Sequence, residues 1–91
     1  MSNPDLTVTE IAVTVKLFAA FQETIAAEQI ELNLPARSPV VAVFDYLVQD
    51  YPELEKWRSH TRFAINLDFA PPDTELQDGD EVALIPPVSG G

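Results

Sequence analysis

The chain of 91 residues contains no cysteine, only three glycines, a single tryptophan and few basic residues. Without cysteine it has no disulfide, no thiolate metal ligand and no cysteine nucleophile. It also lacks a long apolar run and a basic-then-apolar leader, so we expect a cytoplasmic protein. Five Lys and Arg stand against 15 Asp and Glu, giving a net charge of −10, so phosphate groups would be repelled. We therefore expect no binding to nucleic acid and none to membranes.

The remaining composition is that of a small globular protein. Hydrophobic residues make up 46% and charged residues 22% of the chain, and the length suffices for one core. The segment 1–9 is polar and shows no period, which predicts a flexible N-terminal extension. We expect a folded domain over 10–86 and a mobile C-terminal tail over 87–91.

Two strands and a short helix are predicted in the first 35 residues. Apolar residues alternate with polar ones between Glu10 and Phe18 and again around 30–34, which is typical of half-buried strands. Between them, residues 19–27 favour a helix, with Phe18, Phe21 and Ile25 on one face.

The strongest helix signal follows. Ser38 is a good N-cap, Pro39 suits the first helical position, and one apolar stripe runs to Pro52, which ends the helix. The stripe consists of Val40, Val43, Phe44, Leu47 and Tyr51.

The last third of the chain predicts two more strands. A helical turn is expected over 52–57, a third strand over Phe63–Leu67, and then a loop with Pro71 and Pro72. The pair Asp78-Gly79 predicts a turn into a final strand over Glu81–Ile85. Strand, strand, helix, strand, strand is the order of an α+β roll, the ubiquitin-like β-grasp, with a mixed sheet packed on one main helix.

The chain ends in a segment suited to one kind of chemistry. Pro86 and Pro87 cannot extend a strand ladder, and they bias the chain toward an extended path. Gly90 and Gly91 carry no side chains, so the terminal carboxylate fits through a slot too narrow for other residues. This pattern favours a Gly91 carboxylate that is itself the reacting group.

No group of side chains within the chain has a catalytic pattern. His60 is read as a solvated surface histidine, since basic residues surround it. Asp78 and Asp80 flank a glycine, which is turn chemistry more often than a metal pair, and we expect no metal site. Ser89 has no base nearby in the sequence.

Strand alternation predicts a partner surface. If Val82 and Leu84 face the helix, Ile85 lies on the opposite side of the sheet, where a partner would cover it. Phe69 shares its parity with Ile65 and Leu67, which permits a core role. The acidic stretch from Asp68 to Glu81 either steers a basic partner or only keeps the protein in solution.

The chain contains four motifs that are informative together: Lys16-Leu17-Phe18-Ala19, Ala64-Ile65-Asn66, Leu76-Gln77-Asp78-Gly79-Asp80-Glu81-Val82-Ala83 and Pro86-Pro87-Val88-Ser89-Gly90-Gly91. In combination they resemble the small, sulfur-carrying subunit of molybdopterin synthase, and the similarity covers about Ile11 to Gly91. Compared with this family, the chain has Gln22 where a basic residue is more usual, and extra N-terminal residues.

The resemblance implies that an ATP-dependent adenylyltransferase, similar to ubiquitin-activating enzymes, adenylates Gly91. A cysteine desulfurase system then supplies sulfur, giving a Gly91 thiocarboxylate that attacks a pyranopterin precursor in the large synthase subunit and forms the molybdopterin dithiolene. The chain itself would be non-catalytic, hold no permanent cofactor, and belong to a heterotetramer.

The resemblance also assigns roles along the tail. Val88, Ser89 and Gly90 would thread into the large subunit, while Phe69, Ile85, Pro86 and Pro87 would contact partners. Two alternatives use the same tail. One is sulfur carriage for thiamine thiazole or tRNA thiolation, and the other is a ubiquitin-like modifier joined to other proteins through Gly91.

Overall fold

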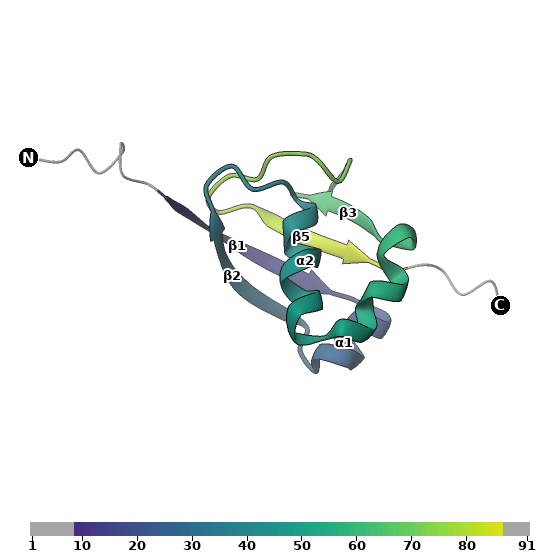
Figure 1. Cartoon of the computed structure of the whole chain (residues 1–91). Coiled ribbons are helices and arrows are strands. Elements are labelled where there is room, and N and C mark those ends of the chain that lie inside the picture. Colours follow the sequence, from purple (N-terminus) through teal and green to yellow (C-terminus); the bar gives the residue numbers. More distant parts are fainter. Residues whose placement is uncertain (1–8, 87–91) are drawn as a thin grey trace, which may run out of the picture.

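A computed structural model of the chain describes residues 9–86, which form a five-stranded sheet covered on one face by helices (Figure 1). The strand order is β2-β1-β5-β3-β4, with β1 and β5 parallel and the other pairs antiparallel. The elements are β1 (Glu10–Leu17), α1 (Ala19–Ile25), β2 (Gln29–Pro35), α2 (Val41–Asp50), the 3-10 helix η2 (Pro52–His60), β3 (Arg62–Ile65), β4 (Asp68–Ala70) and β5 (Glu81–Ile85). The predicted β-grasp fold is confirmed.

The core lies between α2 and the inner face of the sheet. The predicted stripe on α2 is confirmed: Val40, Val43 and Phe44 are fully buried. They pack with inner-face strand residues and with Phe21, whose ring meets those of Phe44 and Trp57 edge to face. Such aromatic contacts add to the stabilisation that burial alone provides.

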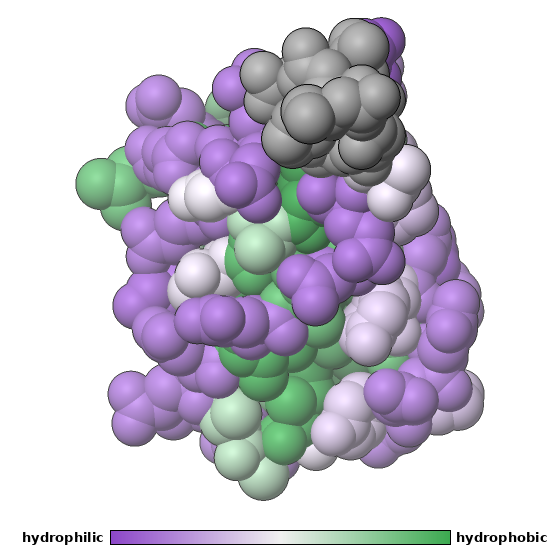
Figure 2. Space-filling view, turned by 90° about the vertical axis from the view of Figure 1, so that its left-hand side faces the viewer, coloured by the Kyte–Doolittle hydropathy of each residue, from purple (hydrophilic) through white to green (hydrophobic). Residues whose placement is uncertain are grey.

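The core reaches the surface along one side of the molecule. Several hydrophobic residues at its border are only partly buried, among them Ile30, Val41 and Val48. Figure 2 looks at the side that lies to the left in Figure 1 and shows a hydrophobic band between hydrophilic flanks. Polar residues therefore frame the core on this side without closing over it.

The predicted start of the main helix was wrong. The Ser38 hydroxyl donates to the Pro35 carbonyl and caps no helical N–H group, and Pro39 forms an isolated β-bridge with Glu75. The first N–H groups of the helix are satisfied from a distant loop instead: Val40 donates to Thr74 O and Val41 to Pro72 O. A helix end needs such partners, and here tertiary structure supplies them.

The third predicted strand is shorter than expected, and a fourth strand replaces part of the predicted loop. Asn66 and Leu67 both have positive φ, at 50° and 76°, and form a two-residue turn between β3 and β4. Positive φ at both central positions is typical of a type I′ hairpin turn. The chain therefore reverses at Asn66, where an extended strand was expected.

The turn before β5 follows the predicted chemistry. Gly79 has φ of 87°, and its N–H donates to Ala12 O at 2.7 Å. Asp78 Oδ1 accepts from the Ala12 N–H, and Asp80 Oδ2 accepts from the Gln77 N–H, both at 2.8 Å. Both carboxylates thus fix the turn and its contact with β1.

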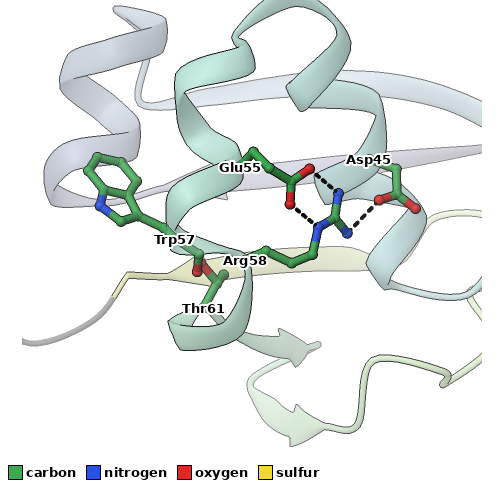
Figure 3. A network of polar contacts seen from close by, with 5 residues as sticks. All are labelled: Asp45, Glu55, Trp57, Arg58 and Thr61. Atoms are coloured by element: carbon green, nitrogen blue, oxygen red, sulfur yellow. Dashed lines mark hydrogen bonds and ion pairs between the residues drawn. The ribbon is translucent and has the colours of Figure 1, made fainter.

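A charged cluster joins η2 to α2 (Figure 3). The Arg58 guanidinium donates twice to Glu55, pairs with Asp45 Oδ1 at 2.6 Å, and stacks on the Phe44 ring. Hydrogen bonds from Arg58 lower the pKa of Glu55, and its two carboxylate partners raise the pKa of Arg58. All three charged groups are largely exposed, so the pairs position η2 more than they stabilise the fold.

None of the helices described between residues 9 and 86 has the length and apolar character needed to span a bilayer.

Candidate functional site

The last strand presents two different faces, as its alternation predicts. Val82 and Leu84 are fully buried in the core, whereas Ala83 and Ile85 are only partly buried. Successive side chains of a strand point to opposite faces, so Ala83 and Ile85 lie on the outer face of the sheet. β5 therefore contributes to the core and to the outer face at the same time.

A row of mainly apolar residues crosses this outer face. Lys16 pairs with Ala83, Ala83 with Ala64, and Ala64 with Phe69, so the four side chains share one face. In the next row, Ile85 stands opposite Arg62. We call Arg62, Ala64, Phe69, Ala83 and Ile85 the outer apolar surface. Small alanines form its centre, where Ala64 is buried and Ala83 partly buried, and larger side chains form its border.

Phe69 has no place in the core. Its exposed fraction is 67%, and its ring lies under the Arg62 guanidinium at 5.3 Å. The core reading of Phe69 is therefore wrong, while its role as a partner contact stays a prediction. Arg62 lies between Phe69 and Ile85. No sequence signal singled it out, because it stands at the start of a strand among other basic residues.

Of the predicted tail residues, the structure describes only Pro86, which is partly buried beside the outer apolar surface. Pro87, Val88, Ser89, Gly90 and Gly91 lie outside the described residues. Their predicted roles stay predictions. The same holds for the flexible extension predicted over 1–9 and the mobile tail predicted over 87–91.

Two exposed hydrophobic residues near the outer apolar surface were not predicted as site residues. Phe18 was expected on one helical face with Phe21 and Ile25, but it precedes α1 in an extended conformation and is 48% exposed. Leu67, at the tip of the β3–β4 turn, is 91% exposed. The preceding asparagine, which tolerates positive φ, was the one signal of this turn.

The charges around the site are mostly negative. The acidic stretch from Asp68 to Glu81 holds six acids and no base, and it begins in β4 and ends in β5. Lys16 approaches Glu81 at 3.7 Å, and both side chains are exposed, so this pair adds little stability. That this stretch steers a basic partner stays a prediction.

The polar residues weighed as catalytic or metal-binding candidates within the described part of the chain lie apart from the outer apolar surface or take part in a turn. His60 is exposed at the end of η2, and Asp78 and Asp80 are engaged in the turn before β5. Among residues 9–86, no cluster of three or more His, Asp or Glu side chains is arranged to hold a metal ion. The outer apolar surface can hold a protein partner, and β5 leads from it directly to the predicted tail.

Comparisons with known proteins show which families this chain is similar to. The model of the ThiS family matches residues 15–91. The chain is 35% identical to the molybdopterin synthase sulfur carrier subunit of Arabidopsis thaliana over 81 residues, covering 89% of this chain and 84% of that protein.

Among solved structures, SAMP1 of Haloferax volcanii, a small archaeal modifier protein, is similar with a TM-score of 0.75 and 30% identity over 88% of this chain and 99% of that one. A complex of subunits 1 and 2 of the Helicobacter pylori molybdopterin-converting factor contains a chain with 26% identity and a TM-score of 0.57, over 89% of this chain and 100% of that one.

Proposed function

Because the chain belongs to the ThiS family, we propose that it is a sulfur carrier for molybdenum cofactor biosynthesis, the small subunit of a molybdopterin synthase. The observation that carries the proposal is the outer apolar surface at the end of β5, five residues before the sequence Gly90-Gly91. A carrier needs a surface that docks and a terminus that reacts, and the two are close together in this sequence.

The reacting group in this proposal is the Gly91 carboxylate. A carboxylate is a poor electrophile, so ATP first converts it to an acyl-adenylate with release of pyrophosphate. A persulfide sulfur then attacks the acyl carbon and AMP leaves. Cleavage of the remaining sulfur–sulfur bond by a thiol yields the Gly91 thiocarboxylate, which attacks the pyranopterin precursor. Acid–base groups belong to the partners, so the chain acts as a non-catalytic subunit.

Two partners follow from this chemistry, a large molybdopterin synthase subunit and an activating adenylyltransferase. Both must hold the carrier while its terminus enters their own active site. The outer apolar surface is suited to this task, because Phe69, Arg62 and Ile85 are contiguous on the sheet and border the exit of β5. The negative charge around it predicts basic side chains at the edge of the partner surface.

The central experiment blocks the terminus. Adding one residue after Gly91 should abolish sulfur transfer to the precursor, because the reactive carboxylate is displaced, while the thermal midpoint stays unchanged. Thiocarboxylate formation is followed by mass spectrometry and the product by molybdopterin assay. The matched control carries one extra residue before Met1. Full transfer by the blocked chain would refute the mechanism.

A second experiment tests the docking surface. Ile85→Lys places a charge on the outer apolar surface, and we expect binding to the large subunit to weaken at least about tenfold while the fold is kept. Tyr46→Lys is the matched control, since Tyr46 is a partly exposed aromatic residue on α2, in the helical layer. The docking assignment fails if Ile85→Lys unfolds the protein and Tyr46→Lys weakens binding to the large subunit as much as Ile85→Lys does.

The likeness to the archaeal modifier proteins favours a second candidate, a ubiquitin-like modifier joined to lysine side chains through Gly91. Mass spectrometry of the chain isolated from cells separates the two functions. One oxygen-to-sulfur exchange at the terminus supports the carrier, whereas Gly91 found in isopeptide bonds supports the modifier. Copurification with a large synthase subunit separates molybdopterin synthesis from thiamine thiazole or tRNA thiolation.

A further inference from the structure

Leu67 is unfavourable at its position for two reasons: its large apolar side chain is exposed to water, and its backbone is in a left-handed conformation. It is the most exposed of the large hydrophobic residues described, at 91%, so burial in the core offsets neither cost. Its φ of 76° lies in the left-handed region, which glycine adopts freely and leucine does not. Asparagine followed by glycine is the preferred pair for this turn, yet leucine stands in the glycine position. Folding alone does not explain this residue.

The turn that carries Leu67 is held firmly in place. The Asn66 N–H donates to Glu81 O at 2.8 Å, and its side chain donates to Asp80 Oδ1 and accepts from the Glu81 N–H, both at 3.0 Å. Three hydrogen bonds thus tie the hairpin tip to the start of β5. A side chain on a fixed backbone loses less freedom on binding than one on a mobile loop, so Leu67 is preorganised for contact.

Leu67 also borders a hollow in the outer face. The hollow has a volume of about 280 Å³ and lies between Leu67 and Phe18, with Ala83, Lys16 and Glu81 among its lining residues. Ala83 belongs to the outer apolar surface as well, so the two are continuous. The contact surface therefore extends from Phe69 and Ile85 across β5 toward β1.

We propose that Leu67 anchors the large molybdopterin synthase subunit by inserting into an apolar pocket that basic side chains surround. The inference rests on the proposed function, which supplies this partner. The basic side chains around that pocket follow from the acids near Leu67. Asp68 is its neighbour in the chain, Asp80 accepts a hydrogen bond from the adjacent Asn66 side chain, and Glu81 lines the same hollow. A second copy of this chain is a poor occupant, because each copy carries a net charge of −10 and would bring acids against acids.

The decisive variant is Leu67→Gly, which removes the side chain and suits the backbone better. We expect the Kd for the large subunit of the same organism to rise about tenfold or more, because one buried leucine contact is lost. The thermal midpoint should stay equal or rise, since glycine relieves the left-handed strain. Leu67→Met, which keeps the apolar volume, should bind within about threefold of the unmodified chain. A merely structural role for Leu67 would not raise stability and weaken binding together.

Three outcomes overturn the inference. One is an unchanged Kd for Leu67→Gly while Ile85→Lys still weakens binding, which leaves the proposed function standing. Another is a loss of affinity matched by a loss of thermal stability. The third is a defect confined to adenylation by the activating enzyme, measured by pyrophosphate exchange, which would assign the anchor to that enzyme. Failure of the unmodified chain to bind the large subunit would instead refute the proposed function itself.

Discussion

Along β5, Val82 and Leu84 are fully buried beneath α2, whereas Ala83 and Ile85, one position away, stay partly open on the opposite face. The inner face is continuous with a core of aliphatic and aromatic side chains. The outer face has small alanines at its centre and exposed Phe69 and Leu67 nearby. One strand thus contributes side chains to a buried core and to an open outer face, and the proposed function assigns recognition to the open face alone.

The largest effect should come from a matched pair of alanine substitutions on that strand. Leu84→Ala leaves a cavity in the core and should lower the free energy of unfolding by about 2–5 kcal/mol. Ile85→Ala removes a partly exposed side chain and should cost only about 1 kcal/mol. Urea denaturation of both variants measures the difference. Equal losses in the free energy of unfolding would show that the outer face of β5 contributes as much to stability as the buried inner face.

A smaller effect is expected at the turn that precedes β5. Gly79 has φ of 87°, and a Cβ atom added there would meet no atom within 4 Å, so only the backbone conformation opposes Gly79→Ala. We expect a loss of about 1–2 kcal/mol in the free energy of unfolding, with partner affinity unchanged, because both faces keep their register. Gly79→Asn is the control and should lose less, since asparagine tolerates positive φ. Altered affinity in Gly79→Ala would instead link the turn to recognition.

The smallest effect should be a pH dependence in the helical layer. Hydrogen bonds from Arg58 lower the pKa of Glu55 in the folded state. The stability that Glu55 adds is therefore fully present above its pKa in the unfolded chain. This stability is lost as the pH falls through its pKa in the folded protein. The thermal midpoints of Glu55→Gln and the unmodified chain should therefore differ at neutral pH and converge in acid. Glu53→Gln, an exposed acid on the same 3-10 helix, is the control. A difference that grows in acid would contradict the assignment.

The inner face was more predictable than the outer one. Alternation in β1, β2 and β5 and the stripe on α2 predicted the buried residues, because burial imposes a period on the sequence. On the outer face, no such period exists. The apolar run from Phe63 to Leu67 suggested one long strand, and only the two positive φ angles of the structure show that it ends at Ile65. The outer position of Phe69 depends on that reversal, so the sequence left it open.

The start of α2 shows a second limit of sequence reasoning. Ser38-Pro39 is a favourable local cap, yet the helix begins later because carbonyls of Pro72 and Thr74 accept its first hydrogen bonds. Those partners are distant in sequence, and no local pattern reports them. Phe18 is a similar case, since a helical face was expected and an extended residue before the helix was found.

The position of β5 between β1 and β3 has a consequence for synthesis of the protein. β1 is made early, but its parallel partner is made late: Thr14 pairs with Glu81 and Leu17 with Leu84. Pairing over such a long loop is slow, and until it occurs the emerging chain has a gap in the centre of its sheet. A chain released before β5 would lack Ala83 and Ile85, two of the five residues of the outer apolar surface. Because β5 is made last, this surface is complete only when the whole sheet has been synthesised.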